Sequence, residues 1–302
     1  MERGLSTEQV EAQAELPRSG RGVSGNAQRP PGRRRRGSWL VFVTPKEPIP
    51  RPAFLTLSVI GFIIPFALWA GLTYGGVLSS FFLPTPTTVV GTLWTMITQQ
   101  DFLTDVWASV YRILIGFVIS AVIGVPLGIL IGSFQSFQAL FEQPVSFARY
   151  LPASAFIPLL IVWFGFDESE KVAVIIIGSF FQLTLLVADI SAGVPKELLN
   201  IAYTLGASRR QVFARVLLPA CLPGIVDTLR IIIGWAWTYI IVAELVAAQS
   251  GIGHVILDAE RFSATDQIVA GILTIGILGL ITDTIFRVFH HLMFPYVERV
   301  ER

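Results

Sequence analysis

Long apolar runs constrain this chain more than any other feature of its sequence. Six of them are close in length to the roughly 20 helical residues that cross the hydrocarbon core of a bilayer. They cover residues 54–74, 107–132, 144–165, 171–191, 222–247 and 266–292. With 53% hydrophobic and only 14% charged residues, the chain is too apolar for a water-soluble globular domain. We therefore expect an all-α membrane protein with about six transmembrane helices.

The third apolar run, residues 144–165, differs from the others because it contains Pro152 and Pro158. A proline inside a helix removes a backbone hydrogen bond and clashes with the preceding turn. We therefore expect this run to be kinked or partly re-entrant. The Gly and Pro residues of the first two runs are of the kind that membrane helices tolerate.

The first 53 residues are rich in Gly, Pro, Arg, Glu and Gln and include four consecutive arginines at 33–36. Such a segment contains too little apolar surface to fold, so we expect a largely disordered tail over 1–53 and a membrane domain over 54–302. Because the first long apolar run begins only near Phe54, we expect no cleaved signal peptide. The arginine cluster either holds the tail in the cytoplasm as a topology signal or binds anionic lipid or a partner.

The distribution of Lys and Arg predicts the orientation in the membrane. Positive residues gather in the tail, near the C-terminus, and in the segment that contains Lys196, Arg209, Arg210 and Arg215. Residues 75–106, by contrast, contain no Lys or Arg. Because cytoplasmic segments carry the excess of these residues, we expect six spans with both termini in the cytoplasm.

The segment between the fourth and fifth runs combines charge with two short amphipathic patterns. Pro195 stands where a first helical turn would begin, Gly206 permits the backbone to turn, and Ser208 and Gln211 have the spacing of a capping box. The apolar positions are Leu198, Ile201, Ala202 and Leu205 in the first pattern and Val212, Phe213, Val216 and Leu217 in the second. We expect the second pattern to end at Pro219. Two short helices joined by a corner suit insertion into a groove of another protein, and the alternative is an ordinary loop on the membrane surface.

The same segment resembles the motif of ATP-binding-cassette importer permeases, which reads Glu-Ala-Ala, three residues, Gly, nine residues, Ile, one residue, Leu-Pro. Gly206 and Leu218-Pro219 stand at the matching spacing, Val216 replaces Ile, and Asn200-Ile201-Ala202 replaces Glu-Ala-Ala. The resemblance extends over residues 54–292. Within it, residues 82–90, 157–171 and 243–256 are similar to the branch that carries nitrate, bicarbonate, cyanate, taurine and aliphatic sulfonates.

This resemblance implies the type I importer permease fold in an inner membrane, with the corner as a cytoplasmic coupling helix that contacts an ATPase. The contacting residues would be Leu205, Gly206, Ala207, Ser208, Arg209, Leu218 and Pro219. It further implies two ATPase subunits that carry ATP and Mg, a second permease copy in a homodimer or close heterodimer, and an external solute-binding protein. The expected substrate is a small oxyanion, with nitrate and bicarbonate favoured over taurine.

The sequence itself predicts no catalytic or cofactor site. A P-loop needs Lys after Gly, and none of Lys46, Lys171 and Lys196 follows a glycine, so ATP hydrolysis would need a separate subunit. Cys221 is the only cysteine and the histidines lack neighbouring ligands, which leaves no metal site. A net charge of +1 gives no basic field for nucleic acid. An ion-gradient-driven secondary transporter and a channel remain as rivals, although we find no inverted repeat.

Polar residues within the apolar runs are candidates for the substrate path, because buried charge in a membrane is costly and commonly functional. The candidates are Gln182, Thr184, Arg230, Trp235, Trp237 and Glu244. Gln182 is an uncharged donor suited to an anion that must bind weakly. The two tryptophans either line the path or serve in helix packing or lipid contact.

Three charged positions carry structural alternatives. Glu244 is either an outer gate or one half of an ion pair, and Arg112 either reaches the outer interface or pairs with an acid on a neighbouring helix. Arg230 either pairs with Asp227, three residues earlier on the same helix, or contacts the anion. We expect Asp167, Glu168 and Glu170 to form a solvated outer loop and residues 250–256 to form a tight element outside the fifth span.

Overall fold

The computed structural model of the chain describes residues 49–296. The chain divides into one unit of residues 55–300 and another of residues 1–54 with 301–302, of which only the start of the first helix is described. The expected disordered tail therefore lies almost entirely outside the described residues. Throughout 49–296 the chain forms helices and turns and no strand, which confirms the all-α class.

The helices that are long and apolar enough to cross a membrane number five within the described residues, or six if a bent pair is counted as one span. The five are α1 (Arg51–Tyr74), α3 (Phe102–Ser133), α6 (Glu168–Ala192), the run Arg209–Val246 that includes most of α9 (Leu218–Ala247), and α11 (Thr265–Met293). The bent pair is α4 (Gln135–Arg149) followed by η4 (Ala153–Phe156) and α5 (Ile157–Phe164), with an angle of 85°. The count and the interrupted third span agree with the sequence prediction.

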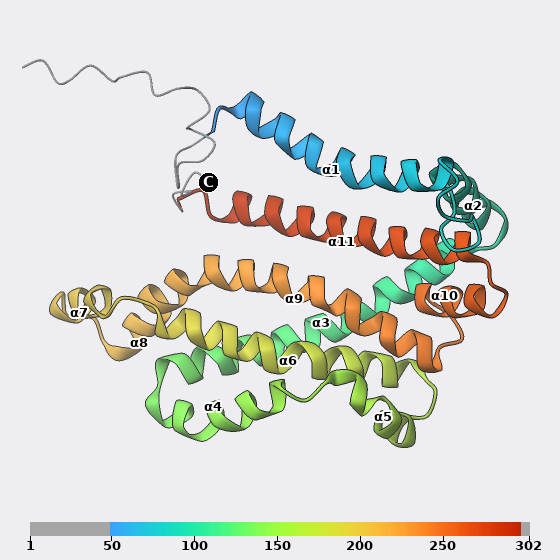
Figure 1. Cartoon of the computed structure of the whole chain (residues 1–302). Coiled ribbons are helices and arrows are strands. Elements are labelled where there is room, and N and C mark those ends of the chain that lie inside the picture. Colours follow the sequence, from blue (N-terminus) through green and yellow to red (C-terminus); the bar gives the residue numbers. More distant parts are fainter. Residues whose placement is uncertain (1–48, 297–302) are drawn as a thin grey trace, which may run out of the picture. The chain divides into compact units, whose positions relative to one another are not determined.

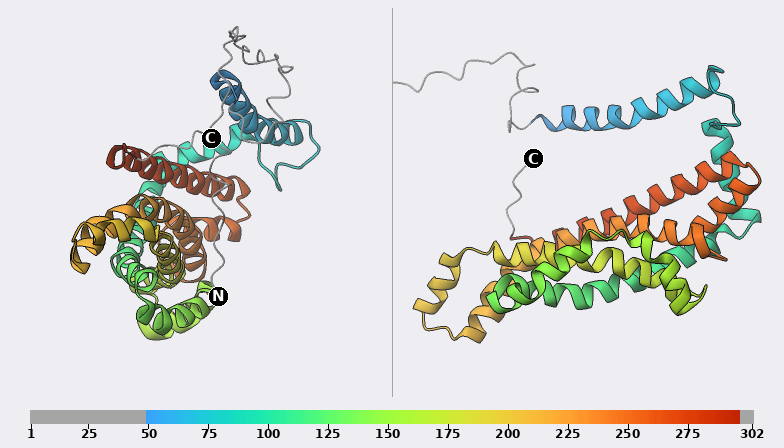
Figure 2. Two further views of the ribbon diagram at one scale, coloured as in Figure 1. Left: turned by 90° about the vertical axis from the view of Figure 1, so that its left-hand side faces the viewer. Right: turned by 60° about the horizontal axis from the view of Figure 1, so that its bottom comes forward.

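Helices α3, α6 and α9 form the packed centre of the unit (Figures 1 and 2). Glycines four residues apart on α3 allow its backbone to approach α6 closely. A Cβ atom at Gly128 would lie 2.5 Å from the carbonyl oxygen of Thr184, and one at Gly132 would lie 2.2 Å from that of Ala188. Small residues at such spacing are a usual means of close helix packing in membranes.

Helix α1 contributes little to this centre. The most apolar stretch of α1 is 0% buried and that of α11 is 11% buried, compared with 44% for α6. The exposed side chains of α1 and α11 are mostly large and apolar, as expected of helices that face lipid or another membrane subunit.

Two further helices, α2 and α10, were not predicted from the sequence. Helix α2 (Pro86–Gln99) begins at Thr85, whose side chain accepts the backbone N–H of Thr88, and it packs on α11, where Thr92 donates a 2.6 Å hydrogen bond to Asp266. Helix α10 (Ile252–Arg261) lies against α9 and α11. Both are amphipathic and short, so neither shows the long apolar run that indicates a span.

Candidate functional site

The break in the third span results from Pro152. A residue before proline is driven out of the helical region, and proline itself has no N–H to donate, so α4 ends at Arg149 and η4 begins at Ala153. Pro152 itself is extended, with φ −65° and ψ 122°. Irregular backbone at membrane depth is tolerated where it lines a water-filled cavity or is covered by protein.

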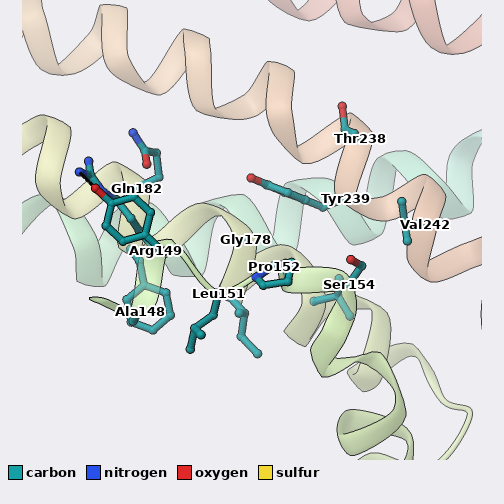
Figure 3. A pocket seen from close by; sticks show the side chains of 15 residues that line it. Ala148, Arg149, Leu151, Pro152, Ser154, Gly178, Gln182, Thr238, Tyr239 and Val242 are labelled. Atoms are coloured by element: carbon teal, nitrogen blue, oxygen red, sulfur yellow. Dashed lines mark hydrogen bonds between the residues drawn. The ribbon is translucent and has the colours of Figure 1, made fainter. Parts of the chain in front are cut away.

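A cavity of about 300 Å³ lies beside this break (Figure 3). Its walls come from the end of α4, from η4, from α6 and from the C-terminal half of α9. The lining residues are Ala148, Arg149, Tyr150, Leu151, Pro152, Ala153, Ser154, Val174, Ile177, Gly178, Phe181, Gln182, Thr238, Tyr239 and Val242. Because Gly178 and Gln182 lie near the middle of α6, the cavity is at mid-depth of the helical unit.

The charge of this cavity comes from Arg149. The guanidinium Nη2 donates a 3.1 Å hydrogen bond to the Tyr150 hydroxyl, and its carbon lies 5.0 Å from the centre of the Tyr150 ring. The lining contains no Asp or Glu, and no carboxylate within residues 49–296 forms an ion pair with Arg149. Neutral donors complete the lining, so the cavity is positively charged.

Tyr239 fits the wall of the cavity because α6 has a glycine opposite it. A Cβ at Gly178 would lie 2.6 Å from a ring atom of Tyr239, which would force the ring aside. Figure 3 shows the hydroxyl end of Tyr239 directed toward the side of the cavity that holds Gln182 and Arg149. The ring therefore closes one wall while its polar end remains in the cavity.

The predicted path residues fall in different places. Gln182 lines the cavity. Thr184 is buried and donates to the Phe180 carbonyl, so it faces α3. Trp237 is also buried, with its indole N–H 3.3 Å from Thr282 of α11, and Trp235 is exposed but outside the lining.

Sequence reasoning missed Arg149 and Tyr150. An arginine inside the third apolar run, three residues before Pro152, was the available signal, because an intramembrane cation next to a helix break indicates a polar cavity.

Glu244 is one half of a buried ion pair. It is 0% exposed and lies 2.7 Å from Nη1 of Arg112, which is itself 1% exposed. The carboxylate also accepts from the Ser109 hydroxyl and, at 2.9 Å, from the Gly253 backbone N–H. Of the alternatives for Glu244 and Arg112, the structure has the ion pair between neighbouring helices, and Glu244 does not line the cavity.

Arg112 also binds a second acid. Its Nε and Nη2 donate to Glu168 at 2.5 and 2.6 Å, and the remaining donors reach the carbonyl and hydroxyl oxygens of Ser250. Glu168 and Glu170 thus lie in α6 rather than in the expected loop, and Glu170 is buried rather than solvated. Glu168 starts α6 against Arg112, and Glu170 is fully buried beside Lys171 at 3.6 Å.

The tight element after the fifth span is confirmed, and its glycines explain it. Gly251 has φ +112°, a conformation that other residues rarely adopt, and its N–H donates to Asp105 at 2.8 Å. The turn is thereby tied to α3 and to Glu244.

The predicted Asp227–Arg230 pair does not form. Arg230 instead lies 3.5 Å from Asp283 of α11, which also binds Arg287, and Asp227 lies 3.6 Å from His290. Because Asp227 and Arg230 are displaced from each other around α9, each side chain contacts a partner on α11 instead. These contacts join α9 to α11.

The corner forms as two helices, α7 (Lys196–Thr204) and α8 (Arg209–Val212), at the end of the unit opposite α10 (Figure 1). Gly206 has φ +83°, and the capping box is present: Gln211 accepts the Ser208 N–H at 2.8 Å, and Ser208 accepts the Gln211 N–H. Leu205 is 83% exposed at the tip. The exposed apolar tip and the glycine turn make this a rigid projection.

Pro219 does not end the second helix, which corrects the sequence prediction. A π-helical turn, η5 (Phe213–Leu217), joins α8 to α9, and Leu218 N–H bonds to Phe213 O. The N–H of Leu218 thus bonds to the carbonyl five residues earlier instead of four. This wider turn comes directly before Pro219, which has no N–H to donate, and the helix continues through the proline. The result is one run of 38 residues, Arg209–Val246, from the corner to the cavity wall.

A groove of about 590 Å³ lies between this corner and the end of α3. It is lined by Ser133, Phe134, Leu199, Tyr203, Arg209, Arg210, Val212, Phe213, Ala214 and Leu217. Within residues 49–296, no group of three or more His, Cys, Asp or Glu is placed to hold a metal ion.

Known proteins are similar to this chain in sequence. Residues 124–295 match the family described as "Binding-protein-dependent transport system inner membrane component". The SsuC protein of Bacillus subtilis, named for aliphatic sulfonates transport, is 35% identical over 230 residues, which cover 75% of this chain and 83% of SsuC. The taurine transport system permease TauC of Escherichia coli is 30% identical over 252 residues, 82% of this chain and 92% of TauC. The nitrate import permease NrtB of Synechocystis is 31% identical over 191 residues, 63% of this chain and 70% of NrtB.

Solved structures show the same fold. A chain of the MetNI methionine ABC transporter aligns with a TM-score of 0.56 and 20% identity, covering 63% of this chain and 95% of its own length. A chain of an amino acid ABC transporter aligns with a TM-score of 0.53 and 12% identity, and the alignment covers 67% of this chain and 96% of that chain. The fold is that of type I ABC importer permeases, and its relatives are transporter components rather than enzymes. The chain therefore belongs to the family of binding-protein-dependent transport system inner membrane components.

Proposed function

We propose that this chain is the membrane-spanning subunit of an ATP-driven importer for a small oxyanion, and that a separate subunit hydrolyses the ATP. The observation that carries the proposal is the unbroken helical run Arg209–Val246, which begins at the exposed corner and ends in the wall of the mid-depth cavity. A force applied at the corner would reach Thr238 and Tyr239 without crossing a flexible joint.

The corner is the proposed docking element for the ATPase. Gly206 fixes the turn, and the exposed Leu205 places an apolar side chain at the tip, where a hydrophobic groove of the partner could bury it. Ala207, Ser208 and Arg209 complete the contact surface. Leu218 and Pro219 form the junction through which the motion passes into α9. ATP and Mg would reside on the partner, and this chain would bind no cofactor.

The mechanism that we propose is alternating access. Closure of two ATPase subunits would draw two corners together, one from each permease copy, and tilt the α9 helices. The cavity would then open first to the outside, where a solute-binding protein delivers the anion, and afterwards to the cytoplasm. Both chain termini lie in the cytoplasm in this arrangement, as the positive-inside distribution predicts.

The substrate class rests on the cavity charge and on the relatives. SsuC, TauC and NrtB are named for sulfonates, taurine and nitrate, each of which carries a compact group of negatively charged oxygens. A cavity with Arg149 and no acid matches that chemistry. We favour nitrate or bicarbonate as the anion and a homodimer as the arrangement of the two permease copies.

The test is purification of the tagged full-length protein from its native membrane, with identification of the bound chains and an ATPase assay. We expect an ATPase to co-purify with the wild type. Gly206→Val should lose it, because valine at a φ of +83° is strained and distorts the corner.

Gly276→Val is the matched control. Gly276 lies in α11, where a Cβ atom would meet open space, and it has no positive φ that would strain a valine. If Gly206→Val retained the ATPase as fully as Gly276→Val does, the docking role of the corner would be refuted.

A further inference from the structure

We infer that the cavity beside the α4–η4 break is a water-accessible binding site for a monovalent oxyanion, such as a small alkyl sulfonate or nitrate, with Arg149 as the anion-binding group. Its place in transport rests on the proposed function, but the site itself rests on the geometry of Arg149, Tyr150 and Gln182.

The depth of Arg149 in the helical unit determines what can surround its charge. A charged side chain at the centre of a bilayer costs about 3 kcal/mol or more, so an exposed arginine at that depth must face water or a polar partner. Arg149 is exposed and lies beside Gln182, near the middle of α6, and it lines a cavity that includes irregular backbone. Water in that cavity would solvate the guanidinium.

Within residues 49–296, no carboxylate compensates the charge of Arg149. The partner of Arg149 is the neutral Tyr150, through the 3.1 Å hydrogen bond and the 5.0 Å ring contact. This contrasts with Arg112, whose donors are occupied by two carboxylates and Ser250. Arg149 thus retains a full positive potential and free donors, whereas Arg112 does not.

The size and the charge of the cavity suit weak binding of a small anion. A volume of about 300 Å³ is at the lower end for ligand pockets and admits an anion of a few heavy atoms with its water. The other polar side chains that line the cavity are neutral, namely Tyr150, Ser154, Gln182, Thr238 and Tyr239. One cation in an open cavity holds an anion weakly, and a site on a transport path requires that the anion can leave.

The experiment measures the charge selectivity of the cavity directly. Ser154→Cys, in a Cys221→Ala background, places a reactive thiol of nearly unchanged size in the lining. The full-length protein in nanodiscs is treated with the anionic reagent sulfonatoethyl methanethiosulfonate, itself a small alkyl sulfonate, or with its cationic trimethylammonium counterpart. Ser80→Cys, in an exposed outer loop, gives the reference ratio of the two modification rates.

The measured quantity is the rate of modification by the anionic reagent divided by the rate for the cationic reagent. At low ionic strength we expect this ratio to be about tenfold higher at Ser154→Cys than at Ser80→Cys, because the guanidinium attracts the anionic reagent and repels the cationic one. Arg149→Gln should remove the preference, while Arg149→Lys should keep most of it. Arg261→Gln, which removes an exposed arginine of α10 outside the cavity, should leave the ratio unchanged. Millimolar nitrate should slow modification by the anionic reagent.

Three results would overturn the inference. Equal preference at Ser154→Cys and Ser80→Cys would show that the cavity does not select anions. Resistance of Ser154→Cys to both reagents would show that water and anions do not enter. A preference that survives Arg149→Gln would assign the selectivity to another group. None of these readouts needs ATP or a partner, so failure here is distinct from failure of the ATPase to co-purify.

Discussion

The buried pair of Arg112 and Glu244 gives the sharpest stability prediction. Arg112→Leu would leave the Glu244 carboxylate 0% exposed, with hydrogen bonds from Ser109 and Gly253 but without a counter-charge. Removing one partner of a buried ion pair costs about 3–5 kcal/mol, because an uncompensated charge stays in a medium of low dielectric constant. We expect the free energy of unfolding to fall by that amount.

Two further variants separate the contribution of the buried Arg112–Glu244 ion pair from that of the partly exposed Arg112–Glu168 ion pair. Glu168→Gln removes only the outer carboxylate, which is 58% exposed, so it should cost about 1 kcal/mol or less. Adding Glu244→Gln to Arg112→Leu removes the unpaired charge but retains an acceptor for Gly253, and it should recover at least half of the loss.

The assay is unfolding of the purified protein in mixed micelles at increasing mole fractions of dodecyl sulfate, followed by circular dichroism. A loss below about 1 kcal/mol for Arg112→Leu would show that Glu244 finds water or neutralises at little cost. An equal fall in the free energy of unfolding for Arg112→Leu and for the double variant would show that packing, rather than charge, stabilises the contact between α3 and α9. Either result would refute the electrostatic reasoning.

Three further predictions follow from packing, capping and composition. Gly128→Leu should separate α3 from α6 and lower the unfolding midpoint well below that of Gly91→Leu, because its Cβ would lie 2.5 Å from the Thr184 carbonyl oxygen whereas Gly91 has open space. Ser208→Ala should remove half of the capping box, cost about 1 kcal/mol locally, and weaken ATPase co-purification less than Gly206→Val does. Deleting residues 1–30 should leave assembly intact, and loss of the ATPase from the truncated protein in a pull-down would contradict the expected disorder of the tail.

The features that could be predicted from the sequence are those set by local signals. Span length follows from apolar runs, the broken third span from Pro152, and the corner from Gly206 and the Ser208–Gln211 pair. Each depends on residues within a turn or two, so the structure reproduces them. The second corner helix is the exception, since the π-helical turn that carries it past Pro219 has no such local signature.

The partners of the intramembrane charges could not be predicted. Arg112 and Glu244 are 132 residues apart in the chain, and their contact depends on how α3 and α9 are rotated against each other. The same holds for Arg230, whose nearest acid, Asp283, is on α11. A single sequence shows that such charges need partners, because isolated charges in lipid are costly, but not which partners they have.

The cavity was predicted only in part for a related reason. Gln182 is an uncharged donor at the middle of a span, which is a local signal, whereas the prolines are the prominent feature of the run that contains Arg149. The significance of Arg149 depends on the break, which turns α4 so that Arg149, Gln182 and Tyr239 line the same space. Amphipathic α2 and α10 were missed because outer helices of this length leave no long apolar signal.

Uptake into proteoliposomes distinguishes import driven by ATP hydrolysis on a separate subunit from import driven by an ion gradient. The complex would be reconstituted with its solute-binding protein, and accumulation of labelled nitrate and taurine would be measured with ATP on the cytoplasmic side or with an imposed proton or sodium gradient. We expect accumulation that requires ATP and is abolished by Gly206→Val but not by Gly276→Val. Accumulation driven by an ion gradient without ATP would refute ATP-driven import and favour a secondary transporter.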